Sequence, residues 1–219
     1  MIEKILPKRV VAVEARRDQT GVKLYPEEEL AVGRAVEKRR REFTTARMCA
    51  RAALDQLGLP VAPIPSGERG APQWPAGVVG SITHCDGYRA CALGRSSEFV
   101  TIGIDAERNA PLPDGLLGDI ARPEELPLLR MLELDRPEVH WDRLLFSAKE
   151  SVYKAWFPLA KRWLGFEDAT IVFDSSAGTF MCRLLVSGPP LGGGPLRGFS
   201  GRWMVHDEII ATAIAVSAC

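Results

Sequence analysis

The chain has 219 residues, and its 28 Lys and Arg residues balance 28 Asp and Glu residues, so the formal net charge is zero. A hydrophobic content of 46% and a charged content of 26% indicate a globular protein large enough to bury a sizeable core. The balanced charge gives no support to nucleic-acid binding. No stretch approaches 18 apolar residues and the first residues lack an apolar signal segment, so we expect a cytoplasmic protein without membrane insertion.

The five cysteines argue against a disulfide framework and against a zinc site. Their number is odd and no C-x-x-C spacing occurs. His84, Cys85 and Cys91 have poor spacing for zinc and lack a fourth ligand. We therefore expect reduced thiols.

The N-terminal half predicts a strand, a helical region and three further strands. Pro26 and the three glutamates after it mark a helix start, and Gly58 with Pro60 marks its end. Gly33 and the Thr44–Thr45 pair leave open whether this region is one helix or two. A Pro- and Gly-rich loop follows. The predicted strands cover residues 10–13, 78–82, 88–93 and 99–104, and the last three would suit an antiparallel meander.

The C-terminal half repeats the order of a helix followed by strands. Residues 110–137 are rich in Pro and Leu and predict one short helix among exposed loops. Apolar residues at helical spacing predict a helix over 141–156, disturbed by Pro158 near its end. Strands are predicted over residues 170–173, 179–185, 201–206 and 209–216, with a Gly/Pro-rich turn at 188–195. The recurrence suits two similar lobes with an interface between them.

Two carboxylates, Asp105 and Glu107, follow the predicted strand at residues 99–104. Apolar residues alternate at Val100, Ile102 and Ile104, as in a half-buried strand. Continuing the alternation puts Asp105 and Glu107 on one side, roughly 7 Å apart. A hard cation such as Mg²⁺ would relieve their repulsion, because it prefers oxygen ligands. The alternative is that the strand ends here and both acids lie in a solvated turn.

Glu150 and Lys154 lie on the polar face of the second helix. At 100° per residue they point about 140° and 180° away from Leu145, which faces the core. They are either an exposed pair on the helix surface or one wall of a cleft, with Glu150 completing a set of carboxylates and Lys154 meeting an anion. Ser147 and Tyr153 lie nearby and fit either interpretation.

Basic side chains gather on the first helical region. Arg39 and Arg47 are eight residues apart, or roughly 12 Å along a helix, with Phe43 between them. They form either a solvated basic face or a set of phosphate ligands, since arginine binds oxygen anions bidentately. The sequence contains no Walker A motif, no G-x-G-x-x-G after a strand and no G-x-S-x-G nucleophile elbow. A bound phosphate would therefore be held by side chains and a metal.

Several motifs in order resemble those of the Sfp-type 4′-phosphopantetheinyl transferases. They are G-S-I-T-H-C at Gly80–Cys85, G-I-D-A-E at Gly103–Glu107 and F-S-A-K-E-S-V-Y-K-A-W at Phe146–Trp156. The segments Arg39–Phe43 and Arg162–Asp168 resemble the branch of enterobactin synthase component D, which includes the mycobacterial type II enzymes. The resemblance covers most of residues 38–173.

The resemblance implies an α+β protein of two similar lobes with pseudo-twofold symmetry and the active site in the cleft between them. Residues 1–104 would form the N-terminal lobe, which holds the nucleotide end of coenzyme A. Residues 105–219 would form the C-terminal lobe, with the metal, the base and the carrier-docking surface, for which the Leu-rich segment 112–132 is a candidate. Family members of this length are usually monomers.

The resemblance also implies an activity: transfer of 4′-phosphopantetheine from coenzyme A to a serine of an acyl or peptidyl carrier protein, with release of 3′,5′-ADP. Mg²⁺ or Mn²⁺ would be the metal, bound by Asp105, Glu107, Glu150 and the Ala106 carbonyl. Glu150 would be the general base or mainly a metal ligand, and Lys154, helped by Lys149, would neutralise the pyrophosphate. The nucleotide end would be held by Arg39, Arg47, Thr83, His84 and the loop Ser66, Gly67, Glu68 and Arg69.

One departure from the family pattern and two alternative functions stay open at the level of sequence. The family commonly has a lysine in the loop where this chain has Ser66 and Arg69, so either residue could contact phosphate. The alternatives in function are a metal-dependent phosphodiesterase, which needs no protein acceptor, and a coenzyme A-binding regulatory module, which needs no Glu150.

Overall fold

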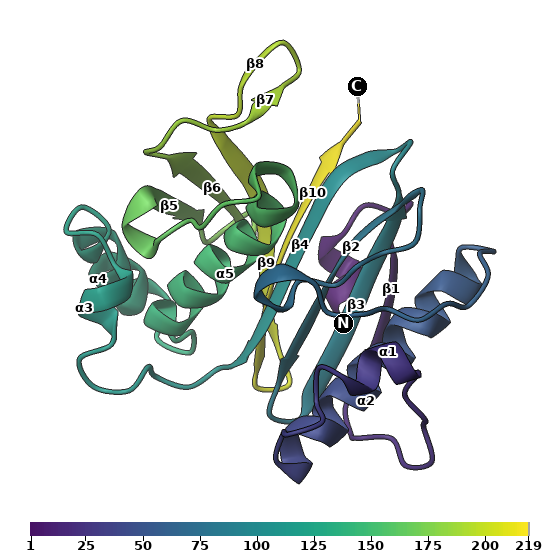
Figure 1. Cartoon of the computed structure of the whole chain (residues 1–219). Helices are drawn as coiled ribbons and strands as arrows, with labels where there is room; N and C mark the ends of the chain where they lie inside the picture. Colours follow the sequence, from purple (N-terminus) through teal and green to yellow (C-terminus); the bar gives the residue numbers. More distant parts are fainter. Residues whose placement is uncertain (219) are drawn as a thin grey trace.

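The computed structural model describes residues 1–218 and contains two antiparallel sheets, each crossed by a long helix (Figure 1). The smaller sheet has the strand order β1-β3-β2, from β1 (Val11–Ala15), β3 (Tyr88–Arg95) and β2 (Val78–Cys85). The short helix α1 (Pro26–Glu29) precedes α2 (Glu37–Gln56), which packs on this sheet through Cys49, Ala50, Ala53 and Leu54.

The larger sheet has the strand order β4-β10-β9-β6-β5. Its strands are β4 (Phe99–Arg108), β10 (Ile209–Ser217), β9 (Gly198–His206), β6 (Thr179–Leu184) and β5 (Ala169–Asp174). Helix α5 (Trp141–Ala160) lies across it, and α3 (Leu117–Ile120) and α4 (Leu126–Asp135) pack beside α5. Short elements complete the chain: β7 (Pro190–Leu191), β8 (Gly194–Pro195) and 3₁₀ turns at Ile2–Ile5, Glu68–Gly70 and Phe166–Asp168.

The α+β class is confirmed, and the unit of one long helix on an antiparallel sheet occurs twice. The division into lobes at residues 104 and 105 stays a prediction, and that boundary falls inside β4. No helix within residues 1–218 is long and apolar enough to cross a membrane.

The structure settles one question left open by the sequence and differs from two predicted elements. The helical region 26–57 is two helices, separated by a turn at residues 30–36. The predicted meander is interrupted, because β2 pairs with β3 whereas β4 pairs with β10 from the end of the chain. Residues 110–137 contain two helices instead of one, and Leu129 and Leu132 of α4 are buried against α5.

Strand β4 is buried on both faces, whereas the alternating pattern predicted only one buried face. Ile102, Ile104 and Ala106 pack in a core cluster on one side. Helix α5 covers the other side, where Gly103 allows the helix backbone to approach: a Cβ at residue 103 would lie 2.7 Å from Ala155 N. The Thr101 hydroxyl also donates a hydrogen bond to the Ala155 carbonyl at 2.8 Å. This close packing brings the carboxylates that follow Ile104 beside α5.

Candidate functional site

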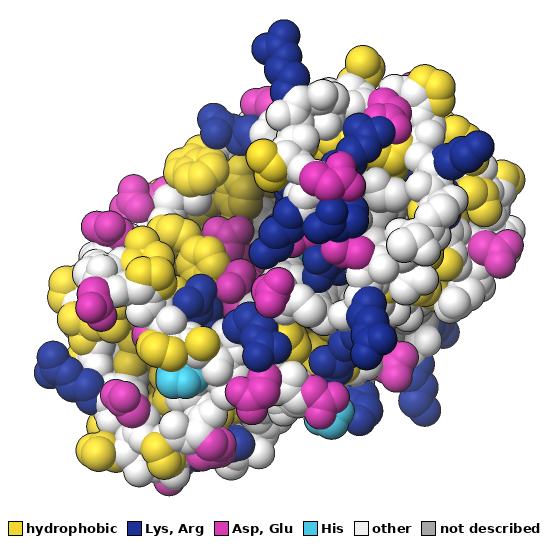
Figure 2. Space-filling view, turned by 90° about the horizontal axis from the view of Figure 1, so that it is seen from below, with side chains coloured by type: hydrophobic (Ala, Val, Ile, Leu, Met, Phe, Trp, Pro, Cys, Tyr) yellow, Lys and Arg dark blue, Asp and Glu magenta, His cyan; other side chains and the backbone are white. Residues whose placement is uncertain are grey.

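A cavity of about 1010 Å³ lies between α2 and α5. One wall comes from α2 and β2, another from α5, and the loop that contains the 3₁₀ turn Glu68–Gly70 borders both. Seen from below, Lys and Arg side chains gather next to Asp and Glu side chains toward the middle of the molecule (Figure 2). The charged and polar residues that line the cavity include Arg39, Arg47, Ser66, Glu68, Arg69, Ser81, His84, Glu150, Tyr153, Lys154 and Lys161.

Asp105 lies on β4 behind the cavity lining, where it contacts Lys154 of α5, and is 4% exposed. Its Oδ1 accepts hydrogen bonds from Lys154 Nζ at 2.7 Å and from the Thr83 hydroxyl at 3.2 Å. Its Oδ2 is buried without a hydrogen-bond partner among the described residues. A buried carboxylate oxygen without a donor is costly, so Oδ2 marks a position where a cation or a donor fits.

Glu107 lies two residues farther along β4 and is partly buried. Its Oε2 accepts a hydrogen bond from Arg143 Nη1 at 3.3 Å. Burial, and next the negative charge of Asp105, raise the pKa of Glu107 to about 7. Arg143 also donates to the carbonyls of Ala110 and Pro111, so it holds the chain that leaves β4.

Glu150 lines the cavity from α5. Burial, and next the charge of Asp105, raise the pKa of the Glu150 carboxyl, while Lys154 one turn farther along the helix opposes the shift. Lys154 lines the same wall and forms its ion pair with Asp105 there. Both residues thus face the cavity, and the interpretation of an isolated exposed pair on the helix surface is wrong.

Asp105, Glu107 and Glu150 offer the oxygen ligands that a hard divalent cation prefers, but the three carboxylates are not gathered around one point. No group of three His, Cys, Asp or Glu side chains within residues 1–218 is arranged to hold a metal ion. The Oδ2 of Asp105 is nevertheless unpartnered, and burial, followed by the charge of Asp105, raises the pKa of Glu107 and of Glu150, so a bound cation would favour their ionised forms. Oxygen donors of this kind suit Mg²⁺. The Ala106 side chain packs in the core and its N–H donates to Thr83, so only its carbonyl is a candidate ligand.

Arg47 provides a buried positive charge on the opposite wall. The residue is 3% exposed, its guanidinium lies 4.1 Å from the Phe43 ring, and Nη2 donates to Ser66 Oγ at 3.1 Å. Burial lowers the pKa of Arg47 to about 10, so it remains charged near neutral pH. Among the described residues no carboxylate lies within ion-pair distance of Arg47, and its Nε has no acceptor. A buried guanidinium without a counter-ion favours an anionic ligand.

Arg39 and His84 meet at the rim of the same wall. The Arg39 guanidinium contacts the His84 ring, and His84 Nε2 lies 3.7 Å from Glu42 Oε2. Burial, and next the charge of Arg39, lower the pKa of His84 to about 4, so the ring is neutral near pH 7. An anion bound between the two side chains would oppose this shift and favour the protonated ring.

The loop at residues 66–70 borders the cavity between the walls. Arg69 lies 5.2 Å from the Trp163 ring centre, so it reaches across toward the α5 side. The buried carboxylate of Glu28 fixes the start of this loop, because it accepts hydrogen bonds from Ile64 N at 3.0 Å and from Arg51 at 2.6 Å. Glu28 therefore ties α1 and α2 to the loop that contains Ser66, Gly67, Glu68 and Arg69.

Three predicted ligands of coenzyme A, namely Asp105, Lys149 and Thr83, are not among the residues that line the cavity. Lys149 is 3% exposed, and its ammonium donates to Glu125 Oε2 and to the carbonyls of Ile120 and Phe166 on the far side of α5. This position corrects its predicted role at the pyrophosphate, because its contacts join the α3–α4 region to the 3₁₀ turn Phe166–Asp168, away from the cavity lining. Thr83 is 1% exposed and its hydroxyl bonds Asp105 and Ala106, so its contact with the nucleotide stays a prediction.

The structure adds three residues that the sequence patterns did not single out. Glu28 and Arg143 position parts of the site, and Trp163 faces Arg69 and Tyr153 at ring distances of 5.2 and 4.9 Å. Their partners are distant in sequence, so no local spacing indicates these roles. The sequence left the surroundings of Ser147 and Tyr153 undecided. In the structure Ser147 is buried against Thr212, whereas Tyr153 lines the cavity.

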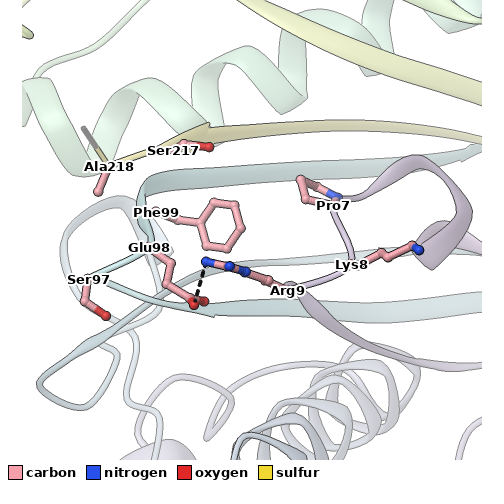
Figure 3. A pocket seen from close by; sticks show the side chains of 8 residues that line it. All are labelled: Pro7, Lys8, Arg9, Ser97, Glu98, Phe99, Ser217 and Ala218. Carbon is pink, nitrogen blue, oxygen red and sulfur yellow. Dashed lines mark hydrogen bonds and ion pairs between the residues drawn. The ribbon is translucent and has the colours of Figure 1, made fainter.

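A second hollow of about 430 Å³ lies near the start of β4 (Figure 3). It is lined by Pro7, Lys8, Arg9, Ser97, Glu98, Phe99, Ser217 and Ala218, and Arg9 is paired there with Glu98 at 3.3 Å. None of the predicted site residues lies in this hollow, so the large cavity is the candidate site.

Comparison with known proteins identifies the family. Residues 27–94 match the family model of the 4′-phosphopantetheinyl transferase N-terminal domain, and residues 101–189 match that of the 4′-phosphopantetheinyl transferase superfamily. The chain is 52% identical to 4′-phosphopantetheinyl transferase Svp of Streptomyces mobaraensis, over 100% of this chain and 90% of the relative. It is 51% identical to Npt of Nocardia iowensis (98% and 99% covered) and 46% identical to PptT of Mycobacterium tuberculosis (99% and 98% covered). The chain belongs to the 4′-phosphopantetheinyl transferase family and is an enzyme that transfers phosphopantetheine from coenzyme A to carrier proteins.

Proposed function

We propose that the cavity between α2 and α5 binds coenzyme A, with its phosphates between the arginines of α2 and Lys154 of α5. The observation that supports this orientation best is Arg47, a buried guanidinium that lines the cavity without a carboxylate partner among the described residues. Lys154 lines the opposite wall, so a ligand with separated anionic groups would meet a cation at each side.

The nucleotide end of coenzyme A would lie on the α2 side. Arg39 and His84 would bind its phosphate at the rim, where the lowered pKa of His84 would rise again next to an anion. Ser66 already orients Arg47, whereas Arg69 lies farther out beside Trp163. We therefore assign the phosphate contact in this loop to Arg69 and an orienting role to Ser66.

A divalent cation, Mg²⁺ or Mn²⁺, would be held by Asp105, Glu107 and Glu150, with the Ala106 carbonyl as a further ligand. When bound, it would neutralise charge on the pyrophosphate oxygens during transfer. Lys154 would then serve both Asp105 and the pyrophosphate, since its ammonium has three donors. The unpartnered Oδ2 of Asp105 supports this assignment.

Glu150 would accept the proton of the attacking carrier serine. Its raised pKa makes it a stronger base than an ordinary glutamate, and it lines the cavity. The serine comes from the partner, which agrees with the absence of a nucleophile elbow in this chain. Chemistry on this chain is therefore limited to binding, orientation and removal of one proton.

The carrier would be an acyl or peptidyl carrier protein that approaches the open side of the cavity, and the enzyme would act as a monomer. The Leu-rich segment 112–132 is a poor docking surface as a whole, because Leu112, Leu129 and Leu132 are buried. Leu116 and Met131 are the apolar residues of this segment that remain exposed.

Mass spectrometry of an apo carrier protein tests the proposal. Incubation with the enzyme, coenzyme A and Mg²⁺ should add the mass of one phosphopantetheine group to the carrier, and chelation of the metal should abolish the addition. Glu150→Gln should slow transfer by about 10²- to 10⁴-fold, as expected for loss of a general base. Transfer at the normal rate after chelation would contradict the metal, and an unchanged rate in Glu150→Gln would contradict the base.

A further inference from the structure

The strands β2 and β4 lie side by side although they belong to different sheets. Hydroxyl groups of β2 connect them. Ser81 Oγ accepts a hydrogen bond from Ile104 N at 3.1 Å, and Thr83 Oγ1 accepts one from Ala106 N at 3.0 Å. Thr83 differs from Ser81 in that it also donates to a side chain, Asp105 Oδ1, at 3.2 Å.

The geometry at Thr83 fixes the direction of its hydroxyl proton. A threonine hydroxyl has one proton to donate and accepts through its lone pairs. Since the Ala106 N–H occupies the acceptor side, the proton is free to bond Asp105. Asp105 Oδ1 thereby receives two donors, Thr83 and Lys154, while Oδ2 receives none among the described residues. Two donors on one oxygen hold the carboxylate in a single rotation.

We propose that Thr83 is a positioning residue for Asp105, whose carboxylate it holds with Oδ2 free for a divalent cation, and that it does not contact the nucleotide. This inference rests on the metal site of the proposed function. It explains why Thr83 is 1% exposed and lies outside the cavity lining, whereas His84, the next residue, lines the cavity. Groups that orient a metal ligand typically change metal affinity 10- to 100-fold when removed.

Thr83→Val tests the proposal, because valine keeps the shape of threonine but removes the hydroxyl. The full-length enzyme with coenzyme A is titrated with Mn²⁺, and free Mn²⁺ is followed by electron paramagnetic resonance, with coenzyme A alone as the blank. We expect the Mn²⁺ dissociation constant to rise by roughly 10- to 100-fold. We expect the affinity for coenzyme A, measured by calorimetry in the absence of metal, to change less than about twofold, because the substitution removes no contact with coenzyme A.

Thr212→Val is a matched control. Thr212 is also fully buried and lies opposite Asp105 in the β4–β10 register, but its hydroxyl bonds Ser147 on α5. It should lower thermal stability about as much as Thr83→Val and leave Mn²⁺ affinity near that of the wild type. Thr83→Ser should restore Mn²⁺ affinity, and Thr83→Cys, a weak donor of similar size, should give an intermediate value even if the valine variant does not fold.

The outcomes separate the inference from the proposed function. If wild-type enzyme binds no Mn²⁺ beyond the blank, the metal site itself is wrong and this inference is wrong with it. If wild-type enzyme binds Mn²⁺ and Thr83→Val or Thr83→Cys binds it equally well, only the positioning role is overturned. If Thr83→Val instead keeps its Mn²⁺ affinity but binds coenzyme A more weakly in the absence of metal, Thr83 contacts the nucleotide and the inference is wrong.

Discussion

The Lys154 ammonium lies 2.7 Å from Asp105 Oδ1, and this contact joins α5 to β4 at the cavity. The two residues are 49 positions apart in the sequence, and each supplies the charge that compensates the other. Without Lys154, Asp105 would be a nearly buried carboxylate next to Glu107 and Glu150. Without Asp105, the lysine would keep its place in the cavity wall only as a cation for the substrate.

Replacement of Lys154 by alanine should reduce kcat/KM for coenzyme A by about 10²- to 10³-fold, because a preorganised cation at the transferring group is lost. The measurement is transfer to an apo carrier protein under saturating Mg²⁺. Lys38→Ala is the control, since Lys38 lies in α2 and forms an exposed ion pair with Asp86 at 3.5 Å. That variant should stay within about twofold of the wild type, and an equal loss in both would contradict the role of Lys154.

Replacement of Arg47 by lysine should raise KM for coenzyme A by about 10- to 100-fold with little change in kcat, because lysine lacks the fork that binds a phosphate. Arg41→Lys, on the same helix, is the control, because Arg41 is half exposed and pairs with Glu37. Steady-state kinetics at varied coenzyme A separate the two parameters. A drop in kcat with unchanged KM would place Arg47 at the reacting centre instead of the nucleotide.

Local patterns predicted most of the secondary structure and the residues at the heart of the site. Apolar periodicity predicted helix α5 and the strands of the larger sheet. The order of the motifs indicated that Asp105 and Glu150 belong to one metal site. From the residues alone, however, an exposed pair on a solvated helix face explained Glu150 and Lys154 better than a cleft wall did. Helical angles give a direction relative to the core but not what lies opposite.

The errors at β4 and Lys149 have a common cause in contacts between distant segments. β4 leaves the predicted meander because β10, more than 100 residues later, pairs along its length. Lys149 and Glu150 are neighbours in one motif, but they lie in different surroundings. Lys149 is buried beside Glu125, whereas Glu150 lines the cavity. Thr83 was grouped with His84 for the same reason, and alternation along a strand separates them. For β10 and Lys149, no spacing within a motif contains this information, whereas the alternation along β2 contains it for Thr83.

Replacement of Gly103 by alanine should destabilise the protein by about 1–3 kcal/mol, the usual cost of overpacking. The added Cβ would lie 2.7 Å from Ala155 N and 2.9 Å from the Ala155 Cβ, so α5 must shift away from β4. Lys154 and Glu150 would move with it, and kcat should fall as well. Gly118→Ala is the control, because nothing lies within 4 Å of its added Cβ. Denaturant unfolding gives the stability, and a Gly103→Ala variant as stable as the control would contradict the close packing.

The metal-free protein should lose stability as the pH rises from about 4.5 to 7. Burial and the charge of Asp105 raise the pKa of Glu107 from 4.5 to about 7, so the folded state binds this proton more tightly than the unfolded state. The stabilisation is therefore complete below the unfolded pKa and is lost as the pH passes the folded one. The difference corresponds to about 3 kcal/mol at most. Glu150, whose pKa is also raised, adds to the same trend.

Thermal unfolding across this pH range, with chelator and with saturating Mg²⁺, measures the effect. Glu107→Gln should flatten the curve recorded with chelator, because glutamine is neutral at every pH, whereas Glu133→Gln on the exposed face of α4 should leave it unchanged. Saturating Mg²⁺ should reverse the slope, since a cation binds the deprotonated carboxylates and gains affinity as they ionise. A pH dependence that Glu107→Gln and Mg²⁺ both leave intact would show that the charge conflict lies elsewhere in the chain.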